Sequence, residues 1–189
     1  SKVQAKSAGS SPGRKGLAAD DQLIPEGRNP RVAAFVFAET PMNPLTNILS
    51  VSQVLLDLDA SSKKRVFEQA GMLFESHLGL ARSVVFDSLF AREKLGSTGL
   101  GQGIAIPHGR IKGLKQAAGA FLRLTNPVPF DSPDGRPVSL LFVLLVPEQA
   151  TEEHLQILSE LAQRFAERPF RDALLAAPDS AAVVALFQA

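Results

Sequence analysis

Three residues of the chain carry side chains that could do chemistry on an anion: Arg92, His108 and His154. A neutral imidazole offers a free lone pair near pH 7, because its unperturbed pKa is about 6.5, and it can therefore attack phosphorus. A guanidinium and a second imidazole can stabilise the oxygens of a transferring phosphoryl group. Each of the three is also typical of a structural turn, a helix end or a solvated surface, and their spacing does not show that they converge.

The residues that flank His108 are suited to holding its imidazole in place. Pro107 fixes its own backbone angle and biases Ile106 toward an extended conformation, so we expect His108 to lie at the end of a strand. Gly109 has no side chain, and we expect it to leave the far side of the imidazole open. The local sequence therefore favours an accessible and rigidly held imidazole.

The stretch from Arg92 to Arg110 contains glycines at positions 96, 99, 101, 103 and 109. Glycine permits backbone angles and close approaches that other residues do not, so a ligand or a partner can reach the main chain here. No Gly-Lys-Ser/Thr follows these glycines, and their spacing does not fit the dinucleotide-binding fingerprint. The stretch predicts a contact loop and gives little support to a nucleotide site.

Composition narrows the class of protein. Lys and Arg number 20 and Asp and Glu number 19, and the formal charge of +1 argues against a polybasic nucleic-acid binder. Hydrophobic residues make up 45% of the chain, which is enough for a buried core. The absence of Cys excludes disulfides, Cys-ligated metal sites and a thiol nucleophile.

Apolar periodicity predicts two helices before the glycine-rich stretch. The first should follow Ser61 or Ser62, either of which is a good cap, and the second should end before Gly96 with Arg92 in or near its last turn. Their apolar residues recur at three- and four-residue spacings, at positions 66, 67, 70, 73 and 74 in the first helix and 85, 86, 89 and 90 in the second.

Three short apolar segments bounded by Gly or Pro predict strands, at residues 105–106, 118–124 and 140–146. The last segment is apolar on both faces, so we expect a central strand covered by helices on each side. The predicted fold is α/β: a single domain in which helices flank a mixed β-sheet sandwich.

Three further helices are predicted after the last strand. Thr151 should cap the first of them, which carries His154 in its first turn, where a helix N-terminus favours negative charge. Pro169 is placed to begin the second, and Asp179 to cap the third.

Residues 1–41 differ in composition from the remainder, being rich in Ser, Gly, Pro and Lys, and we expect a mobile leader or extension before a domain at 42–189. Met42 is a candidate natural start, although Val32–Ala38 could instead form a strand on the domain. The longest apolar run, Val138–Val146, is shorter than the roughly 18 residues of a membrane-spanning helix. Acidic residues precede Val32–Ala38 where a signal peptide would be basic, so we expect a cytoplasmic protein.

Three stretches of the sequence carry a family resemblance: Arg-Glu-Lys-Leu-Gly-Ser-Thr-Gly-Leu-Gly-Gln-Gly-Ile-Ala-Ile-Pro-His-Gly-Arg, and downstream of it Leu-Leu-Phe-Val-Leu-Leu-Val-Pro and Thr-Glu-Glu-His-Leu-Gln-Ile-Leu-Ser. Together they resemble the IIA proteins of the bacterial phosphotransferase system. More narrowly, they are similar to the nitrogen-regulatory IIA proteins of the mannitol/fructose-type family. The resemblance runs from about residue 43 to the end. It implies that His108 is the phosphorylated histidine, that His154 is a second active-site histidine and that Arg92 is the active-site arginine.

The resemblance also implies a mechanism and partners. A phosphorylated HPr-like carrier of the nitrogen branch would pass its phosphoryl group to His108 while Arg92 and His154 neutralise charge, with no cofactor or metal. Regulatory targets such as sensor kinases or potassium transporters would then read the phosphorylation state, without nucleic-acid binding or membrane insertion. The phosphate oxygens are further predicted to contact residues of the glycine-rich loop, namely Ser97, Thr98, Gly101 and Gly103.

Three alternatives stay open on the sequence. Within the family, the chain could be a fructose- or mannitol-specific IIA component that passes phosphate to a IIB domain. In another class, His108 and His154 with Glu152 or Glu153 could bind a metal for hydrolysis, although no HExxH-type spacing is present. The third is a scaffolding domain whose histidines are inert.

Overall fold

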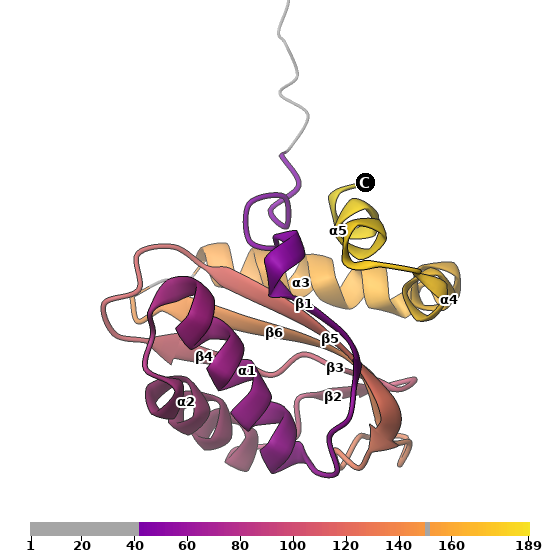
Figure 1. The fold of residues 1–189 in the computed structure, drawn as a ribbon, viewed down its shortest axis with the longest axis horizontal. Helices are drawn as coiled ribbons and strands as arrows, with labels where there is room; N and C mark the ends of the chain where they lie inside the picture. Colours follow the sequence, from indigo (N-terminus) through magenta and orange to yellow (C-terminus); the bar gives the residue numbers. More distant parts are fainter. Residues whose placement is uncertain (1–41, 150–151) are drawn as a thin grey trace, which may run out of the picture. The chain divides into compact units, whose positions relative to one another are not determined.

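The computed structural model describes residues 42–149 and 152–189, and the account below is confined to them. A mixed six-stranded sheet lies between two layers of helices (Figure 1). One face is covered by α1 (Lys63–Leu78) and α2 (Arg82–Lys94), and the other by α3 (Glu152–Ala166), α4 (Arg168–Ala176) and α5 (Ser180–Gln188). The predicted α/β fold, with helices on both sides of a mixed sheet, is confirmed.

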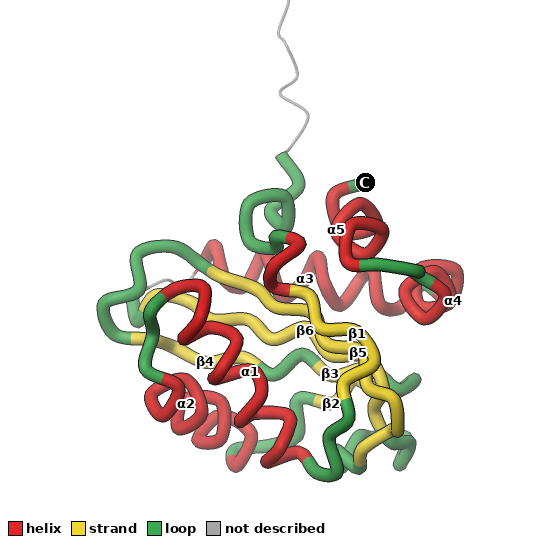
Figure 2. Tube along the Cα trace, viewed as in Figure 1, coloured by secondary structure: helices red, strands yellow, loops and turns green. Residues whose placement is uncertain are grey.

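The sheet is built around β6, which pairs with three other strands (Figure 2). β6 pairs antiparallel with β5 on one side, and on the other side it pairs parallel with β3 and then with β4. β1, which follows the short 3-10 helix η1, extends the sheet beyond β5, and β2 extends it beyond β3. The bounds are η1 (Val51–Gln53), β1 (Val54–Leu58), β2 (Gly99–Gly101), β3 (Ile104–Ala105), β4 (His108–Ile111), β5 (Ala118–Val128) and β6 (Val138–Pro147).

β6 separates the two halves of the core. Successive side chains of a strand point to opposite faces. Leu141, Val143 and Leu145 accordingly join the core under α1 and α2, whereas Phe142 and Leu144 join the core under α3, α4 and α5. All five are fully buried, which confirms the predicted central strand.

The residues predicted to begin or end helices do so in the structure wherever it describes them. The Ser62 hydroxyl accepts a hydrogen bond from the backbone N–H of Arg65, and the Asp179 carboxylate accepts one from the N–H of Ala182. Pro169 lies in the first turn of α4, and α2 ends just before Gly96, with Arg92 in its last turn. The expectations for Thr151, for Val32–Ala38 and for the leader lie outside the described residues.

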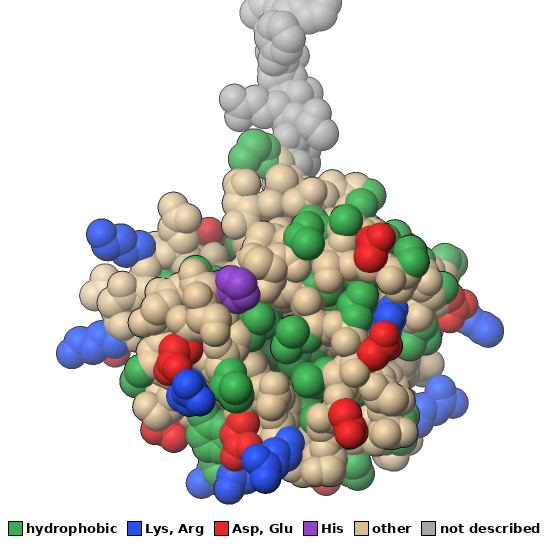
Figure 3. Space-filling view, in the orientation of Figure 1, with side chains coloured by type: hydrophobic (Ala, Val, Ile, Leu, Met, Phe, Trp, Pro, Cys, Tyr) green, Lys and Arg blue, Asp and Glu red, His purple; other side chains and the backbone are tan. Residues whose placement is uncertain are grey.

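The surface follows the balanced composition. On the face drawn in Figure 3, acidic and basic side chains are interspersed, in keeping with the formal charge of +1. Among the described helices, none combines the length and the apolar character needed to cross a bilayer.

The structure corrects the expectation that His108 ends a strand. β3 stops at Ala105, and His108 is the first residue of β4. Both segments keep one register against β6, with Ile104 opposite Leu140 and His108 opposite Leu144. Pro107 lies at the break because it has no N–H to donate to the ladder, although its carbonyl still accepts from Leu144 at 2.9 Å.

Gly109 serves a different purpose from the one expected. A Cβ at this position would lie 2.3 Å from Oγ and 3.2 Å from the carbonyl carbon of Ser88, so the space beside Gly109 is filled by α2 and is not open. The missing side chain lets α2 pack directly on β4. Arg92 lies one turn further along α2 and is thereby placed beside His108.

Replacing Gly109 with Ala should destabilise the fold by about 1–3 kcal/mol, because the added methyl overpacks the α2–β4 contact. Since the nearest atom is the Ser88 hydroxyl, the cost of Gly109→Ala should be smaller in a Ser88→Ala background. Urea unfolding of the four proteins of this double-mutant cycle measures both values. An equal cost in the two backgrounds would contradict the proposed contact.

Candidate functional site

A cleft of about 380 Å³ opens beside β4, where α2 from one layer of helices and the start of α3 from the other approach the same strand. Among the described strands β4 pairs only with β6, so its other side is available to side chains. Arg92, His108 and His154 all line this cleft. The remaining lining residues are Ser88, Ala91, Leu95, Gly109, Arg110 and Val146.

Two hydrogen bonds define the tautomer of His108. Its Nδ1 lies 2.9 Å from the carbonyl oxygen of Ile106, and its Nε2 lies 3.2 Å from Nε of Arg92. A carbonyl only accepts and a guanidinium N–H only donates, so both bonds form together only when Nδ1 carries the proton. The lone pair of the ring is therefore on Nε2, the nitrogen that faces Arg92.

The surroundings of His108 favour the neutral ring. Burial, which disfavours the charged form, is the main cause that lowers the pKa of His108 below its usual value of 6.5. The bond to the Ile106 carbonyl raises it, the charges of Arg92 and His154 lower it, and Glu93 raises it, with a net lowering. The lowered pKa therefore favours the unprotonated imidazole at neutral pH.

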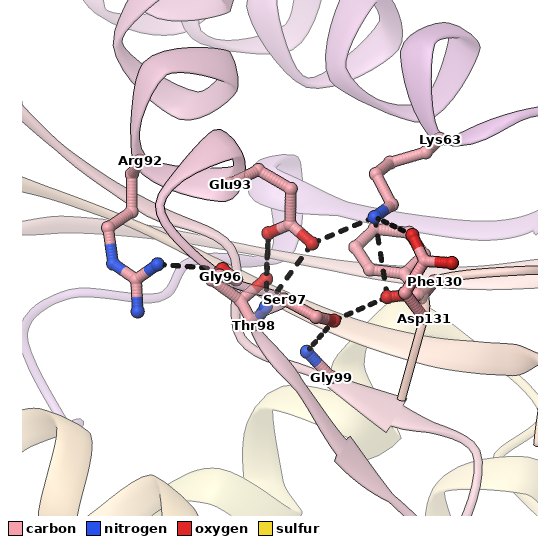
Figure 4. Close-up of polar contacts among 9 residues, drawn as sticks. All are labelled: Lys63, Arg92, Glu93, Gly96, Ser97, Thr98, Gly99, Phe130 and Asp131. Atoms are coloured by element: carbon pink, nitrogen blue, oxygen red, sulfur yellow. Dashed lines mark hydrogen bonds and ion pairs between the residues drawn. The ribbon is translucent and has the colours of Figure 1, made fainter. Parts of the chain in front are cut away.

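Arg92 is held at two points. Its Nε donates to His108, and its Nη1 donates to the carbonyl oxygen of Gly96 at 2.9 Å. Figure 4 shows the guanidinium of Arg92 and the carboxylate of the adjacent Glu93 to either side of Gly96. The Arg92 side chain therefore lines the cleft, whereas the Glu93 side chain is buried in the interior.

Glu93 is a buried carboxylate with a full set of donors. Its side chain is 5% exposed and accepts from Nζ of Lys63 at 3.0 Å, from the backbone N–H of Thr98 at 3.1 Å and from the hydroxyl of Thr98 at 2.5 Å (Figure 4). Lys63 also donates to the carbonyl of Phe130 and lies over the ring of that residue. A buried charge is tolerated only when it is paired and hydrogen-bonded, as here.

This network fixes the turn after α2. Glu93 holds Thr98 at the far end of the turn, and Gly96 lies between them with its carbonyl directed at Arg92. The Ser97 hydroxyl donates to the carbonyl of Phe130 and accepts from the N–H of Gly99. The turn is therefore part of the support of the cleft.

The four residues predicted to contact phosphate, Ser97, Thr98, Gly101 and Gly103, do not line the cleft of His108. The hydroxyls of Ser97 and Thr98 are used inside the protein, by Phe130 and Glu93. Gly101 and Gly103 line other surface cavities and not the cleft of His108. The structure brings Arg92, His108 and His154 together and leaves these four residues outside the group.

His154 reaches the cleft from the third residue of α3 and is half-buried. Its charge is one of the causes that lower the pKa of His108. Glu152 and Glu153 are exposed beside it. Within residues 42–149 and 152–189, no three His, Cys, Asp or Glu side chains cluster as a metal site would require.

Sequence reasoning missed three contributors. Glu93 continues the buried stripe of α2 formed by Val85 and Leu89, and a carboxylate at the next four-residue step is a signal for a buried, paired acid. Arg110 and Leu95 line the cleft, Arg110 two residues after His108 on β4. The alternation of a strand places Arg110 on the same face as His108, whereas nothing in the sequence identifies Leu95.

The fold and the cleft together define a phosphotransferase-system IIA protein. The sequence profile described as "Phosphoenolpyruvate-dependent sugar phosphotransferase system, EIIA 2" matches residues 47–189, and the chain belongs to this family.

Relatives within the family carry nitrogen-regulatory names. The chain is 48% identical over 140 residues to a "Nitrogen regulatory protein" of Pseudomonas aeruginosa, covering 74% of this chain and 91% of that protein. It is 42% identical over 125 residues to the "Nitrogen regulatory protein" of Escherichia coli, covering 66% and 77%. The crystal structure of "Nitrogen Regulatory Protein IIA-Ntr" from Neisseria meningitidis superposes with a TM-score of 0.73 at 55% identity, covering 76% of this chain and 98% of that one.

Removing the Thr98 hydroxyl tests the buried network. Thr98→Val keeps the shape of the side chain but takes away a donor to a buried carboxylate, which should cost about 1.5–3 kcal/mol. Thr98→Ser retains the hydroxyl and is the matched control, with a smaller loss expected. Chemical denaturation measures both, and equal losses in the two variants would show that the hydroxyl does not support Glu93.

Proposed function

We propose that the chain accepts a phosphoryl group on Nε2 of His108 from a phosphorylated HPr-like carrier. The observation that carries this proposal is the pair of hydrogen bonds on the imidazole, which leaves the lone pair on the nitrogen that faces Arg92, another lining residue of the cleft. The lowered pKa of His108 keeps that lone pair available at neutral pH.

The chemical step would be an in-line displacement at phosphorus. The bond between Nε2 and phosphorus forms as the bond between phosphorus and the carrier nitrogen breaks, and the carrier imidazole leaves with that electron pair. Nδ1 of His108 keeps its proton and donates it in a hydrogen bond to the Ile106 carbonyl, and this bond stabilises the positive charge that grows on the ring. Transfer of this kind depends on positioning and electrostatics more than on covalent chemistry of the protein.

Arg92 and His154 would stabilise the transferring group. The N–H of Arg92 that now occupies the lone pair of Nε2 has to move aside for attack, and a guanidinium beside that nitrogen is placed to donate to the phosphoryl oxygens. His154, which lines the same cleft, approaches from the opposite layer of helices. Both side chains can act as cations or hydrogen-bond donors toward the oxygens.

We further propose a regulatory role in the cytoplasm, in which partner proteins read the phosphorylation state of His108. The nitrogen-regulatory names of the relatives support this role. Sensor kinases or potassium transporters are the target classes that the family resemblance implies. The competing role is a sugar-specific IIA component, because the family description includes sugar transport. Transfer of the phosphoryl group onward to a IIB domain would favour the sugar-specific role.

Incubation with phosphoenolpyruvate, enzyme I and an HPr-like carrier should add one acid-labile phosphoryl group, detected by intact-protein mass spectrometry. His108→Ala should abolish the gain, and Arg92→Gln should slow it by about 10²-fold, because one donor to the developing charge is lost. His77→Ala is the matched control, since His77 is exposed on α1 and outside the cleft. Unchanged labelling of His108→Ala, or none of the wild type, would overturn the proposal.

A further inference from the structure

A second recess lies between the β2–β3 turn and α4, and it shares no lining residue with the cleft of His108. It consists of two cavities of about 470 and 500 Å³ that have Gln102 and Arg171 in common. Because the two cavities share these lining residues, we treat them as one recess. We call it the arginine groove.

The groove is positively charged. Arg136, Arg168 and Arg171 line it, with Asp172 as the acidic residue among the lining side chains. Arg168 lies 3.5 Å from Asp172, but both side chains are exposed, and an exposed ion pair of this kind contributes little. Arg136 is 66% exposed and reaches Asp134 only at 3.9 Å. Two guanidiniums can therefore change partner at low cost.

Apolar side chains accompany these charges. Leu100 lines one cavity and Leu175 the other, and these side chains are 46% and 52% exposed. The lining also includes Ile104 and Phe165, which are buried. Exposed apolar side chains beside arginines are the composition of protein interfaces.

The residue at the junction of the two cavities has an unusual backbone. Gln102 has a φ of 57°, in the left-handed region that disfavours a residue with a side chain. Its N–H donates to Asp134 at 2.8 Å, and the N–H of Arg136 donates to the other oxygen of the same carboxylate. Conformations of this kind persist where the surroundings enforce them, often at functional sites. The Asp134 carboxylate thus ties the β2–β3 turn, which carries Gln102, to the loop before β6, which carries Arg136.

We infer that the arginine groove binds an extended acidic segment of a partner protein. Carboxylates of the segment would pair with Arg136 and Arg168, which offer planar, two-pronged donors. Its apolar side chains would cover Leu100 and Leu175. A peptide segment is favoured over a compact anion because the charged and apolar side chains are spread over two cavities.

The test begins with selection of a displayed random peptide library on the full chain, followed by binding measurements with the selected peptides by fluorescence anisotropy. We expect peptides rich in Asp and Glu that also carry apolar residues. Arg136→Glu/Arg168→Glu should weaken their binding by about tenfold or more, and Arg136→Gln/Arg168→Gln by less. Lys64→Glu/Arg65→Glu is the matched control: it makes the same change in formal charge on exposed residues of α1 and should leave binding within about twofold.

A reversal of peptide charge sharpens the result. Peptides whose acids are replaced by Lys should bind Arg136→Glu/Arg168→Glu more tightly than wild type. Selection of peptides without acidic character, or equal weakening by the α1 control, would overturn the inference. Complete displacement of the peptides by inorganic phosphate, with the ionic strength held constant, would also overturn it, because it would indicate a site for small anions. Phosphorylation of His108 is not needed for any of these measurements, so they stand apart from the proposed relay.

Discussion

The hydrogen bond from Nε of Arg92 to Nε2 of His108 is the contact on which the rest of the site depends. It can form only when that nitrogen is unprotonated, and the ring proton is then on Nδ1, which donates to the Ile106 carbonyl. One contact thus selects the tautomer, disfavours the charged ring and places a cation beside the unprotonated nitrogen. The remaining features of the region keep the two side chains in this arrangement.

Both ends of that arrangement are set by close packing of α2. At Gly109 the helix contacts β4 without an intervening side chain, and this brings the last turn of α2 to the edge of the sheet. At the helix end, the buried carboxylate of Glu93 accepts from Lys63 and twice from Thr98, and it fixes the turn whose Gly96 carbonyl holds Arg92. The chemistry of an exposed cleft therefore rests on a charge buried on the other side of the same helix.

The elements of the fold could be predicted because their signals are local. Apolar spacing identified α1 and α2, two-sided apolarity identified β6, and Ser62 and Asp179 mark helix starts through bonds to residues three positions away. The histidines and Arg92 were found through residue type and a family resemblance, and the fold brings all three to one cleft.

What could not be predicted depends on which partners the folded chain supplies to each residue. Gly109 looked open because Ser88, which fills the space, lies 21 positions earlier on another element. Ser97 and Thr98 looked like phosphate ligands because hydroxyls in a glycine-rich loop suit that role, whereas Phe130 and the buried Glu93 use them instead. Hydrogen-bonding capacity can be read from a residue type, but its use is decided by tertiary packing.

The most direct measurement of the central contact is the protonation state of each ring nitrogen of His108, obtained by long-range proton–nitrogen-15 correlation across a pH titration of the full chain. We predict that Nδ1 is protonated and Nε2 is unprotonated at neutral pH. Nε2 should gain its proton at a titration midpoint below the usual pKa of 6.5. A proton on Nε2 at neutral pH, or a midpoint above that value, would contradict this prediction.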